Sequence, residues 1–519
     1  MLQTKCWAAI AATVVSIGLP GVSAAATLHV PGDFATIQAC IDAAVSGVDE
    51  CVVAPGTYHE TINFLGKAIT VRSSGGADVT TIDATGIGGS VVTCASAEGP
   101  DTVLEGFTIT GGRGSPLGGS TCGGGMYNDH SNPTVMGCMF RANAASAGGG
   151  MCNASSSPIV TACTFRGNSG GGGGGMGNYS ASPTVTNCVF SENMSNAGGG
   201  IFNYFSSPTV TNCTFSGNSA YYYGAGMSNY FSSATVTNST FSANTVTNGP
   251  GGAMYNENRS SGWVTNCKFI ANTSMNEPGG GMYNSYYSSP MVANCMFIEN
   301  TGDKGGGMYN TSNSNPLLTN CTFNGNTSNT SGGGMKNVYS SNPTVINCIL
   351  WGDSPDEILN VFSSVPGIRF SNLQGGLPVG TVNGGGNIDF DPMFVRPPDP
   401  GPDGAWDGVD DDYGDLRLRA GSPCINTGDP NFVPLPGETD LDGHARVLCA
   451  GVDMGAYEFG IGDRNCNQTV NLNDFSVWSS CMTGPHSGPY EPGCEGFDFD
   501  GDGDVDLLDF GGFQRIFGP

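Results

Sequence analysis

Charged residues are scarce in this chain of 519 residues, of which they make up only 12%. The 44 acidic and 17 basic residues leave a formal net charge of −27. A chain with so few basic residues offers little to the phosphates of nucleic acid or of an anionic membrane, so we expect neither as a partner. The acidic excess is uneven, because residues 389–519 carry 25 of the acids and only six of the basic residues.

Long apolar runs are almost absent as well. The exception lies in residues 1–26, where Lys5 precedes an apolar run over 7–19 and small residues end at Ala26. This is the pattern of a signal peptide, so we predict export to the extracellular space or the cell surface. No other run could span a bilayer, and we expect no membrane span. Export permits disulfides, for which the sequence offers three close pairs: Cys40/Cys51, Cys424/Cys449 and Cys481/Cys494.

What the chain has instead is a repeat. Between Gly123 and Leu350 the phrase G-G-G-M-Y-N, a loose stretch, and P-T-V-x-N-C-x-F-x-x-N occurs nine times with a period of 25 to 28 residues. Self-similarity at this period is typical of a solenoid. A leucine-rich repeat has a similar period but needs several leucines per turn, and these repeats have almost none. The methionine slot of the phrase falls at Met126, Met151, Met176, Ile201, Met227, Met254, Met282, Met308 and Met335.

The positions of the apolar residues within one repeat indicate which solenoid this is. Met176 and Asn178 alternate with Gly177, as in a short strand. Val185 and Phe190 have opposite parity, and a corner at Asn187 would turn both side chains inward. Each repeat then contains three short strands bent at three corners. We therefore predict an all-β fold, a parallel β-helix with three-strand coils.

Stacked coils place identical residues above one another, about 4.8 Å apart. Asparagine amides in such a ladder can bond to the amides above and below. The cysteines form a second ladder, with Ser239 at its one missing rung, and we interpret them as small buried hydrophobes. A metal or redox role is disfavoured because no histidine or acid recurs beside them. The asparagines are Asn128, Asn153, Asn178, Asn203, Asn229, Asn256, Asn284, Asn310 and Asn337. The cysteines are Cys138, Cys163, Cys188, Cys213, Cys267, Cys295, Cys321 and Cys348.

The first coils have a helical apolar spacing over residues 34–46, which predicts a helix closing the open end of the solenoid. The segments T-I-Q-A-C-I-D-A-A, V-V-A-P-G-T-Y-H-E-T-I and K-A-I-T-V-R-S resemble the opening of pectinesterase-like, carbohydrate-associated right-handed β-helix proteins. The G-G-G-M-Y-N and F-x-x-N elements resemble the repeats of polymorphic outer-membrane proteins, which use β-helical passenger domains as surface adhesins. These resemblances imply a right-handed β-helix.

The end of the chain contains two loops in one register, which start at Asp463 and Asp498. Oxygen ligands at positions 1, 3, 5 and 12, with a carbonyl at 7, surround a hard divalent ion. The duplicated pair resembles a type I dockerin. This implies a small α-helical module that holds two Ca²⁺ ions and docks to a cohesin-type protein. The positions concerned are Asp463, Asn465, Asn467, Thr469, Asn471, Asp474, Asp498, Asp500, Asp502, Asp504, Asp506 and Asp509.

These patterns divide the chain into five parts. Residues 1–26 form the signal peptide, and 27–122 an N-terminal cap with irregular coils. Residues 123–350 form nine regular repeats, 351–460 irregular C-terminal coils with a cap, and 461–519 the dockerin-like calcium module.

Acidic pairs, which polysaccharide-cleaving enzymes need, are missing from the repeats. Only six acids lie between Gly123 and Leu350, and they are scattered, so we assign no catalytic residue. Aromatic residues between the methionine and asparagine slots form a ladder that stiffens neighbouring strands, and they could in addition offer rings to sugar faces. We expect a binding protein for glycan or cell-surface material, with a polysaccharide lyase or glycoside hydrolase as the alternative. The aromatic positions are Tyr127, Phe202, Tyr255, Tyr283 and Tyr309.

Overall fold

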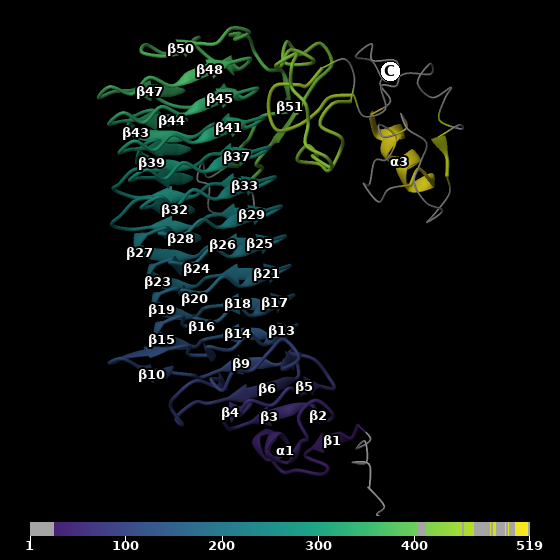
Figure 1. Cartoon of the computed structure of the whole chain (residues 1–519). Coiled ribbons are helices and arrows are strands. Elements are labelled where there is room, and N and C mark those ends of the chain that lie inside the picture. Colours follow the sequence, from purple (N-terminus) through teal and green to yellow (C-terminus); the bar gives the residue numbers. More distant parts are fainter. Residues whose placement is uncertain are drawn as a thin grey trace, which may run out of the picture.

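The computed structural model describes residues 25–402, 411–448, 451–460, 478, 481–483, 494, 497 and 504–516. Its main body is a stack of coils whose strands line up in four long sheets (Figure 1). The all-β parallel solenoid is therefore confirmed. All but residues 25 and 26 of the predicted signal peptide lie outside the described residues. Among the described helices, none has the length and apolar character needed to cross a membrane.

The first sheet, here the valine sheet, points a valine, leucine or isoleucine into the core from nearly every coil. Its outward positions in the central coils are mostly threonines, which suit a pleated, half-exposed surface. It contains β1 (Thr27–Val30), β2 (Glu50–Val53), β5 (Thr70–Ser73), β8 (Val103–Glu105), β13 (Thr134–Met136), β17 (Ile159–Thr161), β21 (Thr184–Thr186), β25 (Thr209–Thr211), β29 (Thr235–Thr237), β33 (Trp263–Thr265), β37 (Met291–Ala293), β41 (Leu317–Thr319), β45 (Thr344–Ile346), β48 (Gly367–Arg369) and β50 (Val382–Asn383).

The second sheet, the phenylalanine sheet, points one ring per coil inward from β14 to β42. Rings in neighbouring coils stack nearly parallel, for example Phe140 on Phe165 with centroids 4.7 Å apart. It contains β3 (Gly56–Tyr58), β6 (Thr80–Asp83), β9 (Thr108–Thr110), β14 (Met139–Arg141), β18 (Thr164–Arg166), β22 (Val189–Ser191), β26 (Thr214–Ser216), β30 (Thr240–Ser242), β34 (Lys268–Ile270), β38 (Met296–Ile298), β42 (Thr322–Asn324), β46 (Ile349–Trp351) and β49 (Asn372–Leu373).

The third sheet, the methionine sheet, carries the methionine and asparagine slots on its inner side. The predicted amide ladder runs through it: Asn128 Nδ2 donates to Asn153 Oδ1 at 2.8 Å, and each later rung repeats the bond. It contains β4 (Ile62–Asn63), β7 (Val92–Cys94), β12 (Met126–Asp129), β16 (Met151–Ala154), β20 (Met176–Tyr179), β24 (Ile201–Tyr204), β28 (Met227–Tyr230), β32 (Met254–Glu257), β36 (Met282–Asn284), β40 (Met308–Asn310), β44 (Met335–Asn337) and β47 (Ile358–Asn360).

A fourth sheet corrects the prediction of three strands per coil. After each F-x-x-N element the chain stays extended for two to five residues and pairs with the same segment of the next coil, where the sequence suggested only a corner. The fourth sheet contains β10 (Ser115–Leu117), β11 (Ser120–Cys122), β15 (Ala144–Ala147), β19 (Ser169–Gly172), β23 (Met194–Ala197), β27 (Ser219–Tyr223), β31 (Thr245–Val246), β35 (Thr273–Ser274), β39 (Thr301–Lys304) and β43 (Thr327–Ser331).

The corners between the sheets use left-handed backbone. Asn187 has φ 54°, which confirms the predicted bend between Val185 and Phe190. Gly198 has φ 64° at the turn from the fourth sheet into the methionine sheet, and a Cβ there would lie 2.3 Å from Ile201 O. Only glycine fits that turn.

The two ends of the stack differ in the structure that follows the last coil. Helix α1 (Ile37–Ala43) lies at the N-terminal end, buries Ile37, Cys40 and Ile41, and confirms the expected closing helix. The Cys40–Cys51 disulfide ties it to β2. At the other end the coils continue to β50, and the described residues 388–402, 411–448 and 451–460 then fold back along the side of the stack (Figure 1).

This C-terminal segment, here the side cap, covers the outer face of the phenylalanine sheet at its last coils, from β38 to β46. Its short antiparallel pair, β51 (Phe394–Arg396) and β52 (Asp415–Leu418), packs in one apolar cluster with outward side chains of β38 and β46, among them Ile298 and Ile349. Ala456 N donates to Thr322 Oγ1 at 3.0 Å across the same contact. The other described helix is α3 (Leu507–Ile516).

Candidate functional site

The predicted aromatic positions all lie on the outer side of the methionine sheet, but they differ in exposure. Tyr127 and Tyr255 are buried, whereas Phe202, Tyr283 and Tyr309 are half-buried. The rings of Tyr255, Tyr283 and Tyr309 stack nearly parallel, with centroids 5.3 and 5.5 Å apart. Glycan binding at these five positions stays a prediction.

Neighbouring side chains explain the burial. Tyr255 contacts Tyr223 of the fourth sheet, with ring centroids 4.8 Å apart, and its hydroxyl donates to Glu257 Oε2 at 2.6 Å. Tyr127 packs beside the disulfide between Cys122 and Cys152, which the sequence analysis missed because Cys152 occupies an aromatic slot. Burial raises the pKa of Tyr127 to about 12. The rings of Tyr127 and Tyr255 are therefore packed between the methionine sheet and side chains of the fourth sheet.

A more exposed row of rings lies at the next corner, where the methionine sheet turns toward the valine sheet. We call this row the aromatic corner. Its members are 44% to 65% exposed, and all have positive φ. Phe205 and Phe231 stack with centroids 4.8 Å apart, and Tyr339 and Phe362 stack at 4.9 Å. The row consists of Phe205, Phe231, Tyr286, Tyr287, Tyr339 and Phe362.

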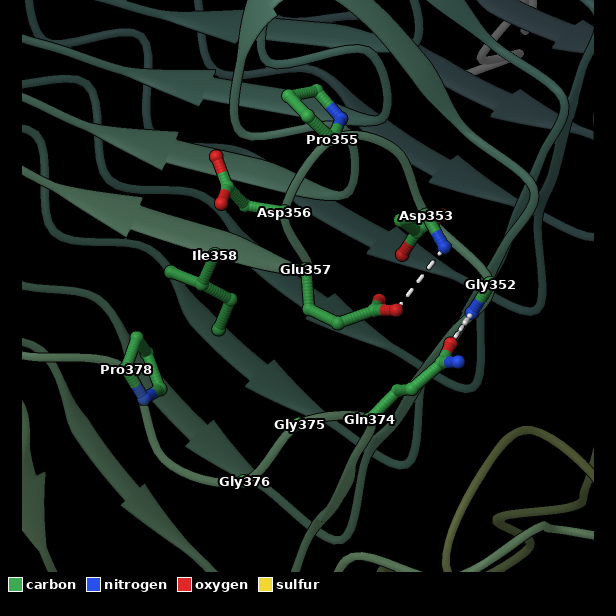
Figure 2. A pocket seen from close by; sticks show the side chains of 10 residues that line it. All are labelled: Gly352, Asp353, Pro355, Asp356, Glu357, Ile358, Gln374, Gly375, Gly376 and Pro378. Carbon is green, nitrogen blue, oxygen red and sulfur yellow. Dashed lines mark hydrogen bonds between the residues drawn. The ribbon is translucent and has the colours of Figure 1, made fainter.

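A pocket of about 490 Å³ lies where the repeat ends, in the coil after β46 (Figure 2). Asp353 and Glu357 lie at its wall and are 7% and 9% exposed. Asp353 N donates to Glu357 Oε1 at 3.1 Å, and Gly352 N donates to Gln374 Oε1 at 2.7 Å. The pocket is lined by Gly352, Asp353, Pro355, Asp356, Glu357, Ile358, Gln374, Gly375, Gly376 and Pro378.

The two buried carboxyls strongly influence each other. Burial raises the pKa of Glu357 to about 7. Burial and the neighbouring charge of Glu357 raise the pKa of Asp353 well above its ordinary value. No single motif in the sequence marks this pair, since it lies where the repeat pattern has already decayed.

Three of the predicted calcium ligands lie among the described residues. Asp504, Asp506 and Asp509 are buried, and one carboxylate oxygen from each lies within 4.8 Å of the others. Hard oxygen donors so gathered suit Ca²⁺. The remaining predicted ligands, Asp463, Asn465, Asn467, Thr469, Asn471, Asp474, Asp498, Asp500 and Asp502, lie outside the described residues.

The cysteines mostly behave as expected. All eight thiols of the cysteine ladder are buried and free. Burial raises the pKa of Cys163 and Cys295, whereas hydrogen bonds from Cys163 and Cys213 lower the pKa of Cys188. Burial is therefore what keeps reagents away from these thiols. The Cys481–Cys494 disulfide is present. The predicted pair Cys424/Cys449 is wrong, because Cys424 is a buried free thiol whose Sγ lies 3.1 Å from Asn372 Nδ2.

A comparison with protein families matches the model described as "Right handed beta helix region" over residues 67–241 and 232–373. The chain belongs to this family. The match covers the coils over residues 67–373 and assigns them to a right-handed β-helix, while it leaves residues 1–66 and 374–519 unassigned. Among curated proteins, none matches the sequence.

The solved structures that are similar to this right-handed β-helix include the following three. Pectate lyase Pel9A is 14% identical with a TM-score of 0.35, over 84% of this chain and 97% of its own. The catalytic unit of a GH87 α-1,3-glucanase from Streptomyces thermodiastaticus is 11% identical with a TM-score of 0.37, over 68% and 66%. The receptor binding domain of the Siphovirus 9NA tailspike is 11% identical with a TM-score of 0.31, over 70% and 76%.

Proposed function

We propose that this protein is an extracellular rod that binds glycan or cell-surface material through the aromatic corner. The observation that carries the proposal is the placement of exposed aromatic rings on left-handed backbone. A bulky residue with positive φ is strained, and a large exposed ring gains little from burial. Other coils place Ser155 or Ser180 at the same corner position. Phe205 and Phe231 therefore need a reason beyond folding.

The geometry of the rings suits a sugar chain. Phe205 and Phe231 lie nearly parallel, with 3° between their planes, and they repeat with the spacing of the coils. Because the two rings cover much of each other's faces, a pyranose ring would contact their exposed edges and the outer faces at the ends of the stack with its apolar C–H groups. The half-buried rings of Phe202, Tyr283 and Tyr309, on the adjoining outer side of the methionine sheet, would extend the contact. An elongated glycan lying along the stack fits this arrangement best.

The test replaces Phe205 and Phe231 together by serine, the residue that other coils use there. We expect at least about a tenfold loss of affinity for the bound polysaccharide, since aromatic contacts are each worth about 1 kcal/mol. Binding would be measured on an array of glycans and by co-sedimentation with insoluble polysaccharides.

The matched control is Trp263→Thr. Trp263 is 50% exposed on the outer side of the valine sheet, where Thr235 is its partner in the coil below. This variant should bind like the parent protein. Equal loss in both variants, or no loss in the serine variant, would refute the aromatic corner as the binding surface.

We further propose that residues 461–519 form a calcium-dependent docking module for a cohesin-type partner. The proposal rests on the two loops in one register and is supported by the gathered carboxylates of Asp504, Asp506 and Asp509. Calcium should supply much of the folding energy of this acidic segment. Limited proteolysis of the full chain should cut it in chelator and spare it in calcium, while the coils stay intact in both.

The variant Asp498→Ala, Asp509→Ala should be cut even in calcium, whereas Asp389→Ala, an acid of the last coils, should behave like the parent. Identical cleavage of all three proteins with and without calcium would show that the loops are ordinary acidic turns.

A second candidate function is cleavage of a polysaccharide, as a lyase or glycoside hydrolase. The pocket beside Asp353 and Glu357 favours it. However, these carboxyls interact directly, whereas glycosidase pairs stand about 5–10 Å apart. No arginine or lysine lines the pocket to act as a lyase base. Incubation with a panel of polysaccharides decides the matter: unsaturated products or new reducing ends would favour the enzyme over the binding protein.

A further inference from the structure

A second ladder of asparagine amides runs through the core beside the phenylalanine sheet. In each coil the backbone N and the side-chain Nδ2 of one asparagine both donate to Oδ1 of the next. Asn300, for example, donates to Asn326 Oδ1 from N at 3.1 Å and from Nδ2 at 2.9 Å. The rungs are Asn143, Asn168, Asn193, Asn218, Asn244, Asn272, Asn300 and Asn326.

The rung after Asn326 is an aspartate. Asp353 Oδ1 accepts from Asn326 N at 2.7 Å and from Asn326 Nδ2 at 2.8 Å, as an asparagine oxygen would. Glu357 then reaches back within the same coil, and its Oε1 accepts from Asp353 N at 3.1 Å (Figure 2). Glu357 thus takes the place of the following rung.

This arrangement lacks the amide hydrogens of the lower rungs. In each of those rungs the second side-chain atom is an amide nitrogen that donates one hydrogen to the rung above and one to a backbone carbonyl of the coil below, as Asn300 Nδ2 does to Asn326 Oδ1 and to Phe269 O. In Asp353 that atom is Oδ2, and in the described structure neither Asp353 Oδ2 nor the buried Glu357 Oε2 has a hydrogen-bond partner. Two buried carboxylates beside each other would repel, and each unsatisfied oxygen would be costly.

We propose that Asp353 and Glu357 hold one shared proton, which replaces the amide hydrogen that each lower rung donates along the ladder and closes the ladder at the wall of the pocket. The pair is a proton-binding site, because both oxygens left without a donor come from acids in contact. When the proton leaves, the ladder loses its final bond, and the loop over residues 352–357 opens toward the pocket.

The other charged groups near the pair do not replace the proton. Asp356 lies in the same loop, and its Oδ2 is 3.5 Å from Gly332 N. Lys336 on β44 donates to Ser331 Oγ at 2.6 Å, and Lys304 on β39 pairs with Asp303. None of these groups is hydrogen bonded to either carboxyl among the described contacts.

The direction of the pH effect follows from linkage. The pKa of Glu357 is raised from its ordinary value of 4.5 to about 7, so the folded coil binds more protons than the unfolded one between these values. The stabilisation is complete below about pH 4.5 and is lost as the pH rises through about 7. The raised pKa of Asp353 acts in the same direction.

The test is amide hydrogen exchange of residues 352–360 in the full protein, corrected for intrinsic exchange, at about pH 5 and about pH 8.5. A pKa difference of one unit changes the equilibrium tenfold, so the opening constant should rise at least about tenfold. In Asp353→Asn and in Glu357→Gln an amide supplies the missing hydrogen permanently, and the rise should fall to about twofold or less.

Asp356→Asn removes a neighbouring acid of the same loop and serves as the matched control, because its pH dependence should match that of the parent. The proposal fails if both amide variants keep the parental pH dependence, if Asp356→Asn abolishes it, or if both amide variants open the loop at every pH. The last result would show that an amide cannot complete this rung.

Discussion

The repeated coils and the side cap satisfy their buried polar groups in opposite ways. In the coils almost every buried polar side chain is a neutral amide, hydroxyl or thiol that bonds to its own copy one coil away. In the side cap the fully buried Arg446 pairs with Glu458 at 3.3 Å, and Asp440 and Asp453 are also buried. The ladders require the same residue in successive coils, whereas the buried charges of the side cap require a specific set of different residues.

The difference teaches how each region should fail. A ladder spreads its polar bonds over many equal rungs, so losing one rung costs only the local bonds. A buried cluster of unlike charges depends on each member, because the partners that remain are left as uncompensated charges. The cap should therefore be more sensitive to single substitutions than the coils.

Arg446→Met should have the largest effect. Arg446 Nη2 also donates to Gly455 O and Asp453 O, and its loss leaves the buried Glu458 without its counter-ion. We expect a cost of about 3–5 kcal/mol and detachment of the cap, measured by chemical denaturation and by protease sensitivity of residues 388–460. Arg417→Met is the control, because its pair with Asp415 is half exposed and should cost about 1 kcal/mol or less. If the two substitutions lowered the free energy of unfolding equally, the buried charges of the side cap would be no more sensitive than exposed ones.

Asn218→Ala should have an intermediate effect. It removes the acceptor for Asn193 Nδ2 at 3.0 Å and the donor to Phe190 O at 2.8 Å, so the cost should be about 2–3 kcal/mol. Asn196→Ala, on the exposed side of β23, should stay within about 0.5 kcal/mol. If chemical denaturation shows that Asn218→Ala lowers the free energy of unfolding as much as Arg446→Met, the ladder does not spread its stabilisation over many rungs.

Cys188→Ser should have the smallest effect. Ser239, at the equivalent rung, donates to Thr237 O at 2.9 Å and accepts from Cys213 N at 3.1 Å, so the hydroxyl is fully satisfied there. We expect a cost of about 1 kcal/mol or less, and Ser239→Cys should be close to neutral. The native thiols should also resist alkylation until the protein is denatured. Ready labelling of Cys188 in the folded state would contradict its burial.

The ladders could be predicted because the repeat itself encodes them. The positions of Met176, Val185 and Phe190 within one period fix which side chains turn inward, and the stacking of equal residues follows. The closing helix was visible from its apolar spacing. Even the second amide ladder was present in the F-x-x-N element, although the sequence analysis took that asparagine only for a corner.

The remaining features depend on contacts that no periodicity announces. The fourth sheet includes segments as different as S-G-G-G over 169–172 and S-A-Y-Y-Y over 219–223, which share a backbone course but no residue pattern. The burial of Tyr127 and Tyr255 depends on that sheet. Asp353 and Glu357 meet in a coil where the repeat has ended, so only the structure reveals that they continue a ladder.

The register of the coils also makes the rod modular in length. Met176 pairs with Met151 below and Ile201 above without a shift. Removing the 25 residues 176–200 would therefore join two coils that already match in every ladder, and shorten the rod by about 4.8 Å. Removing one residue fewer would turn inner side chains outward. The reach of the rod can thus change in whole coils, which lets insertion or loss of single repeats adjust how far the aromatic corner extends.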